Sequence, residues 1–105
     1  MLDRRIDSTD LLAATLDMLA RLVAFDTESS KSNLPLVADV EAYFKALGID
    51  YVKVPNATGD KAALFATIGP KVDGGILLSG HTDVVPVAGQ AWTSDPFKLR
   101  RETDR

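Results

Sequence analysis

Cysteine is absent from this 105-residue sequence, and histidine occurs only once, at position 81. The missing thiols exclude disulfides, thiolate zinc ligands and a cysteine nucleophile, so any chemistry must use oxygen atoms and one imidazole. Basic residues are not concentrated either, because the 12 lysines and arginines are scattered and the formal net charge is −3. Nucleic acids and anionic lipids are usually bound by clustered basic residues. We therefore expect neither a nucleic-acid partner nor a membrane partner.

Long apolar runs are also missing, and none approaches the roughly 20 residues of a membrane-spanning helix. Residues 1–7 mix both signs of charge and lack the apolar core of a secretory signal. The cytoplasm is therefore the expected location. With 46% hydrophobic residues, the sequence can form one small core, which limits it to one domain at most.

Two amphipathic helices are predicted in the first half of the sequence. The first runs from about residue 9 to residue 25, and Ser8 or Thr9 can cap it. Its apolar residues recur at helical spacing and predict one buried stripe, formed by Leu11, Leu12, Leu16, Leu19, Leu22 and Val23.

The second helix is predicted from the residues that begin and end it. Asn33 precedes Pro35 as a cap precedes a first-turn proline, and the helix should run to Leu47. Gly48 follows where a left-handed C-terminal cap is expected. The predicted inward face consists of Leu36, Val37, Val40, Phe44 and Leu47.

Three strands are predicted after the helices. Residues 49–54 and 62–68 are rich in branched or apolar residues and end at turn signals. Residues 76–79 are apolar on both faces, which predicts a strand in the interior of a sheet. The predicted fold class is α/β, with helices packed on a mixed β-sheet.

The only histidine follows the third predicted strand. Residues 76–78 lead through Ser79 and Gly80 to His81 and then Asp83. Ligand sites of open α/β sheets lie outside the carboxyl ends of the strands. An imidazole can bind zinc while a carboxylate orients the ring, and residues two apart in an extended segment project to the same side. This pattern predicts His81 as a metal ligand and Asp83 as its supporting carboxylate, although a lone histidine is more commonly a hydrogen-bonded structural group.

Other residues invite a functional interpretation that we do not favour. Asp26 and Glu28 could form an acid–base pair, but a loop between amphipathic helices is usually solvated. Trp92 could touch a ligand, but an indole beside Pro96 and Phe97 more often anchors a loop to the core.

Two longer strings, residues 77–86 (LLSGHTDVVP) and 92–97 (WTSDPF), carry a family resemblance. Together they resemble the acetylornithine deacetylase and succinyl-diaminopimelate desuccinylase family of dinuclear zinc amidohydrolases. Val87 and Asp95 stand where the desuccinylases typically have proline, so the residues favour the deacetylase branch. Further stretches between residues 25 and 97 are similar to that branch, whereas Ala63 departs from the asparagine common there.

The resemblance has implications for the fold and the site. It implies that residues 1–105 are the incomplete N-terminal part of a zinc-peptidase-like, three-layer catalytic domain, without the dimerisation domain. His81 would bind one of two zinc ions, for which cobalt can substitute, and Asp83 would be the catalytic carboxylate that holds its ring. The remaining ligands and the glutamate general base would come from later parts of the family's chain.

The resemblance also implies a reaction and partners. The substrate would be a small N-acetyl-amino acid, with N2-acetyl-L-ornithine and water giving L-ornithine and acetate in arginine biosynthesis. The full-length enzyme would be a homodimer. We expect the 105-residue chain by itself to be inactive, because most metal ligands and the general base are missing. The alternatives are a truncated, non-catalytic remnant or interaction module, or a fragment of a related desuccinylase or carboxypeptidase.

Overall fold

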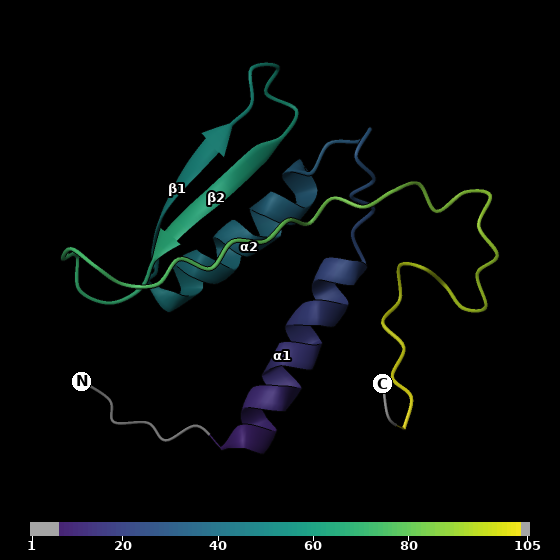
Figure 1. Cartoon of the computed structure of the whole chain (residues 1–105), viewed down its shortest axis with the longest axis horizontal. Helices are drawn as coiled ribbons and strands as arrows, with labels where there is room; N and C mark the ends of the chain where they lie inside the picture. Colours follow the sequence, from purple (N-terminus) through teal and green to yellow (C-terminus); the bar gives the residue numbers. More distant parts are fainter. Residues whose placement is uncertain (1–6, 104–105) are drawn as a thin grey trace. The chain divides into compact units, whose positions relative to one another are not determined.

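The computed structural model describes residues 7–103, so the N-terminal segment of the signal-peptide argument falls largely outside the described part. The order of elements is α1 (Ser8–Val23), α2 (Leu34–Leu47), β1 (Asp50–Pro55) and β2 (Ala62–Thr67), as shown in Figure 1. The chain divides into two units, and Thr27–Pro86 contains all elements except α1. This combination of helices and strands is compatible with the predicted α/β class.

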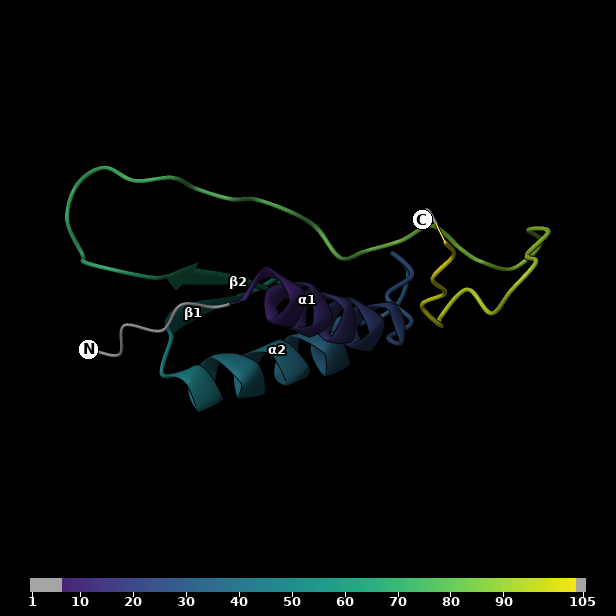
Figure 2. The same cartoon turned by 90° about the horizontal axis from the view of Figure 1, so that it is seen from below.

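The centre of the unit Thr27–Pro86 is a β-hairpin covered on one face by α2 (Figure 2). Strands β1 and β2 pair antiparallel, with a register that runs from Asp50 opposite Thr67 to Pro55 opposite Ala62. In the turn between them, the Asn56 side chain accepts a hydrogen bond from the Lys61 amide at 3.1 Å. The predicted strands at 49–54 and 62–68 are thus confirmed, with ends shifted by one residue.

Helix α2 begins and ends where its sequence predicts, although the Asn33 side chain makes no capping hydrogen bond and bonds the Ala62 backbone instead. Pro35 occupies its first turn, and Gly48 ends it in the left-handed conformation, with a φ of 68° that glycine adopts without steric cost. Leu36 and Val37 are buried against the hairpin side of the unit, whereas Leu47 is 57% exposed and does not join the predicted inward face. The small core therefore lies between the first turn of α2 and Ala62 at the start of β2.

Glu41 links α2 to the first strand of the hairpin. The Tyr51 hydroxyl donates a 2.8 Å hydrogen bond to this carboxylate, and the Lys53 ammonium lies 3.2 Å from its other oxygen. The hydrogen bond from Tyr51 and then the contact with Lys53 lower the pKa of Glu41 below its ordinary value. The same hydrogen bond raises the pKa of Tyr51.

Replacing Tyr51 with phenylalanine should reduce the pH dependence of stability. A carboxyl group with a lowered folded-state pKa stabilises the folded chain above its unfolded pKa, and this contribution is lost as pH falls through the folded value. The stability difference between wild type and Tyr51→Phe, measured by urea unfolding, should therefore shrink below about pH 4.5. Tyr43→Phe is the matched control, because it removes the same hydroxyl group from a tyrosine of α2 whose ring lies beside Phe44. A difference between wild type and Tyr51→Phe that stays constant with pH would contradict this assignment.

The predicted third strand is wrong. Residues 76–83 belong to no β-ladder, and Ile76, Leu77 and Leu78 are 91%, 74% and 91% exposed. A strand requires a neighbour within hydrogen-bonding distance. Between β2 and residues 70–77 lies instead a cavity of about 790 Å³. Within residues 7–103, the sheet is therefore a two-stranded antiparallel hairpin rather than the mixed sheet that the sequence predicts.

Helix α1 belongs to the other unit, with residues 87–103. Asp7 is its N-cap, because its side chain accepts a 2.7 Å hydrogen bond from the Thr9 amide, so the prediction of Ser8 or Thr9 as the cap is wrong. No residue of α1 is buried, and the predicted apolar stripe is therefore not part of a core. An amphipathic stripe is buried only where a neighbouring element offers an apolar surface.

Residues 87–103 form turns and loops. Trp92 is 50% exposed and its indole nitrogen donates a 3.1 Å hydrogen bond to the Val87 carbonyl, so the expected anchoring in a core is not observed. Asp95 accepts a 2.9 Å hydrogen bond from the Phe97 amide, which is typical of a turn. None of the helices described here combines the length and hydrophobicity needed to cross a membrane.

Candidate functional site

The segment that carries the histidine is attached to the loop between α1 and α2. Thr27, which is only 5% exposed, donates a 2.6 Å hydrogen bond from its hydroxyl to the Thr82 carbonyl. The Val84 amide donates to the Thr27 carbonyl at 3.0 Å, and the Ser29 amide donates to the Val84 carbonyl at 2.9 Å. These backbone bonds form a parallel bridge between Glu28 and Val84. The loop thus fixes the backbone on both sides of Asp83.

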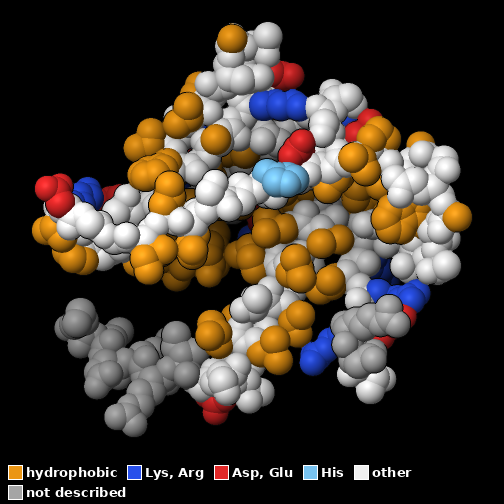
Figure 3. Space-filling model, viewed as in Figure 1, with side chains coloured by type: hydrophobic (Ala, Val, Ile, Leu, Met, Phe, Trp, Pro, Cys, Tyr) orange, Lys and Arg blue, Asp and Glu red, His pale blue; other side chains and the backbone are white. Residues whose placement is uncertain are grey.

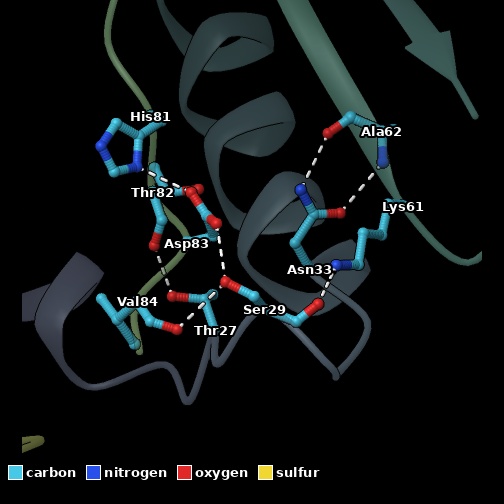
Figure 4. A network of polar contacts seen from close by, with 9 residues as sticks. All are labelled: Thr27, Ser29, Asn33, Lys61, Ala62, His81, Thr82, Asp83 and Val84. Carbon is cyan, nitrogen blue, oxygen red and sulfur yellow. Dashed lines mark hydrogen bonds and ion pairs between the residues drawn. The ribbon is translucent and has the colours of Figure 1, made fainter. Parts of the chain in front are cut away.

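The structure brings His81 and Asp83 into direct contact (Figure 4). The ring Nδ1 atom of His81 lies 2.7 Å from Asp83 Oδ1, and the other ring nitrogen points away from the carboxylate. The two side chains are 84% and 55% exposed, respectively. The ring is therefore available to a ligand at Nε2 and is not sealed in the apolar interior.

Asp83 is held by two donors. The Ser29 hydroxyl donates a 2.7 Å hydrogen bond to Oδ2, while Oδ1 faces His81. The bond from Ser29 and then the bond with His81 lower the pKa of Asp83 below its ordinary value. An ionised carboxylate is only an acceptor, so in this pair Nδ1 of His81 carries the hydrogen. In the neutral ring, Nε2 is then the nitrogen with a free lone pair.

The pair borders a cavity of about 490 Å³ within the unit Thr27–Pro86. Residues 80–83 line one side, and the other walls come from α2 and the beginning of β2. All four residues of α2 that line it are apolar: Leu36, Val37, Val40 and Phe44. In Figure 3, the single pale-blue imidazole lies at the surface beside a red carboxylate.

The residues of this site fit one position of a zinc centre. A neutral imidazole whose second nitrogen is bound to a carboxylate is the usual form of a histidine ligand to zinc. Within residues 7–103, however, no group of three histidine, cysteine, aspartate or glutamate side chains is placed to hold a metal ion. The described residues therefore offer one imidazole with a supporting carboxylate, which is fewer than the three or four protein ligands that a zinc site uses.

Sequence reasoning predicted that His81 and Asp83 lie together, as the structure shows, but it did not point to Thr27 and Ser29 as their neighbours. Ser29 lies 54 positions before Asp83, within a polar stretch that reads as an ordinary turn. No spacing rule connects such distant residues. Glu28, in the same loop, accepts a hydrogen bond from Ser30 and lies 3.8 Å from the Lys31 ammonium. Its side chain is 22% exposed, so it is less solvated than the sequence predicts.

The chain is similar in sequence to known proteins. The chain is 38% identical to the acetylornithine deacetylase of Pasteurella multocida over 91 residues, which cover 80% of the chain and 24% of that enzyme. The chain resembles part of an acetylornithine deacetylase. Two further deacetylases agree: that of Photorhabdus laumondii is 38% identical over 84 residues, and that of Buchnera aphidicola is 32% identical over 104 residues.

The similarity covers most of the chain but only part of each relative. It extends over 78% of the chain and 21% of the Photorhabdus deacetylase, and over 97% of the chain and 26% of the Buchnera deacetylase. The chain thus spans about a quarter of the length of these curated relatives, which is consistent with a match to their N-terminal part. No family model matches the chain, and no solved structure matches it.

Proposed function

We propose that the chain is the N-terminal part of a metal-dependent amidohydrolase that acts on N2-acetyl-L-ornithine. In the proposed reaction, water adds across the amide bond between the acetyl carbon and the amino nitrogen. The C–N bond breaks, the hydroxyl group of water remains on acetate, and a proton goes to the amine of L-ornithine. This reaction belongs to arginine biosynthesis, and a cytoplasmic location is part of the same proposal.

The observation that supports the proposal best is the contact between His81 and Asp83. Their 2.7 Å hydrogen bond holds the imidazole by Nδ1 and leaves Nε2 open beside a cavity. Such a ring needs no rearrangement to bind a metal ion, because its tautomer and orientation are already those of a ligand. The similarity to three acetylornithine deacetylases supports the substrate class.

His81 would bind one of two zinc ions, and Asp83 would keep its ring in place. When bound, zinc supplies Lewis-acid chemistry, which polarises a carbonyl group and makes water acidic enough to react near neutral pH. Cobalt would be an alternative metal. The other ligands, the general base, the remaining strands of a three-layer catalytic domain and a dimerisation domain would lie outside residues 1–105. The intact enzyme would be a homodimer.

A chimera provides the test. Residues 1–105 would replace the matching segment of the Pasteurella multocida deacetylase, and hydrolysis of N2-acetyl-L-ornithine would be measured with added zinc or cobalt. We expect the chimera to be active and to lose activity on chelation. We expect the 105-residue chain alone to show no turnover under the same conditions, because a catalytic zinc site requires about three protein ligands.

Two outcomes would count against the proposal. Turnover by the 105-residue chain alone, abolished by His81→Ala, would show that no further segment is needed. A folded, dimeric chimera without activity would instead favour the non-catalytic remnant or interaction module, for which the exposed run Ile76, Leu77 and Leu78 is the supporting observation. Parallel assays with N-succinyl-diaminopimelate and with a peptide substrate address the desuccinylase and carboxypeptidase alternatives.

A further inference from the structure

We propose that Ser29 is a positioning residue for the metal ligand, acting through Asp83 on the orientation and tautomer of His81. The inference rests on the proposed function for its catalytic consequence. It rests on the geometry of three side chains for everything else, because Ser29, Asp83 and His81 form a continuous chain of hydrogen bonds (Figure 4).

The two carboxylate oxygens of Asp83 contact different side chains. Ser29 Oγ lies 2.7 Å from Asp83 Oδ2, and His81 Nδ1 lies 2.7 Å from Oδ1, so each oxygen has its own donor. A second contact of Ser29 Oγ, to the Val84 carbonyl, is longer at 3.3 Å. The single hydroxyl hydrogen therefore goes to the carboxylate, where the bond is shorter and is strengthened by the charge.

The Asp83 carboxylate needs the hydrogen bond from Ser29 to keep its orientation. Asp83 is more than half exposed, and a carboxylate on an exposed segment rotates readily about its terminal torsion. With Oδ2 held by Ser29, the carboxylate plane is fixed and Oδ1 remains directed at the imidazole. Without this bond, water competes for both oxygens, and the ring loses the partner that selects the Nδ1–H tautomer.

The backbone of Ser29 is itself held by hydrogen bonds. Its carbonyl accepts a hydrogen bond from the Lys61 ammonium, and its amide donates to Val84. Four residues further on, Asn33 exchanges two hydrogen bonds with the backbone of Ala62, at 2.9 and 3.0 Å, which ties the loop to the start of β2. Ser29 is thus supported from the hairpin, so its hydroxyl has a defined position from which to hold Asp83.

Nitrogen-15 NMR of the His81 ring in the 105-residue chain tests this inference. At a pH where the ring is neutral, the wild type should show mainly the Nδ1–H tautomer, and Ser29→Ala should show a mixture of both tautomers. Ser29→Thr, which keeps the hydroxyl, should restore the wild-type spectrum. Ser30→Ala is the matched control, because Ser30 lies in the same loop and its hydroxyl bonds to Glu28 instead of Asp83.

Cobalt titration of the same four proteins, followed at the His81 resonances, gives a second readout. Binding should be weakened about three- to tenfold by Ser29→Ala and should be unchanged in Ser29→Thr and Ser30→Ala. A Ser29→Ala protein with the wild-type tautomer and cobalt affinity would overturn the inference. So would a Ser30→Ala effect of equal size, or a Ser29→Thr protein that fails to recover, since either would indicate a general role in loop folding. Neither readout requires catalysis, so an inactive chimera would refute the proposed function without deciding the role of Ser29.

Discussion

Replacing His81 with alanine in the chimera should remove one of two bound zinc ions and lower kcat/KM for N2-acetyl-L-ornithine by more than about a hundredfold. Loss of a metal ligand should exceed the 10- to 100-fold effect usual for the groups that support such ligands. The effect should not come from misfolding, because His81 is 84% exposed and its only hydrogen bond among the described residues is to Asp83. Elemental analysis gives the zinc content, and steady-state kinetics give the rate.

Thr82→Ala is the control for this substitution. It changes the adjacent residue but keeps the Thr82 carbonyl that accepts the hydrogen bond from Thr27. We expect Thr82→Ala to keep both zinc ions and activity close to that of the unmodified chimera. If His81→Ala also retained two zinc ions per chain, His81 would not be a metal ligand.

Replacing Asp83 with asparagine should weaken metal affinity or reduce the rate by about 10- to 100-fold. Asparagine has nearly the same shape as aspartate and can accept a hydrogen bond through its one oxygen. It lacks the negative charge and the second acceptor, so it cannot serve Ser29 and His81 equally well. The amide can also turn its NH₂ group toward the ring, which would favour the wrong tautomer.

The comparison is best made with Asp73→Asn, which removes the same charge from an exposed residue of the same unit. Cobalt or zinc affinity and kcat/KM should be unaffected by that control. An Asp83→Asn chimera with unchanged affinity and rate would leave Asp83 with a local structural role only.

Helix α2 and the β-hairpin were predicted correctly because short-range sequence signals determine where they begin and end. Pro35 and Gly48 mark the ends of α2 by backbone geometry alone, and the turn residues after Pro55 separate two strands that need only each other for pairing. The hairpin forms from contacts between strands that a short turn connects, and the ends of the helix are determined by its own residues. The positions of these elements can therefore be predicted from short stretches of sequence.

The prediction of a third strand at residues 76–79 was wrong because a strand in the interior of a sheet depends on distant neighbours. The apolar residues Ile76 to Leu78 predict burial on both faces, but burial requires neighbours that residues 7–103 do not provide. The same holds for the apolar stripe of α1, where the periodicity indicates an interface but not its partner. A hydrophobic pattern states what a segment would bury and gives no information about what covers it.

The candidate site was predictable only in part. His81 and Asp83 are two residues apart, so an extended backbone places their side chains on the same side. Thr27 and Ser29 reach the same segment through tertiary structure, across 55 and 54 positions. A hydroxyl group has no characteristic spacing, and its role becomes visible only when the loop is folded against its target.

The exposure of Ile76, Leu77 and Leu78 also has a thermodynamic consequence. Three large aliphatic side chains that stand in solvent keep a shell of hydration water, and this shell adds to the heat capacity of the chain. Whatever molecule or segment comes to cover them must release that water and lower the heat capacity. Near room temperature, the gain is mainly in solvent entropy, so the attraction of this surface strengthens on warming and weakens in the cold.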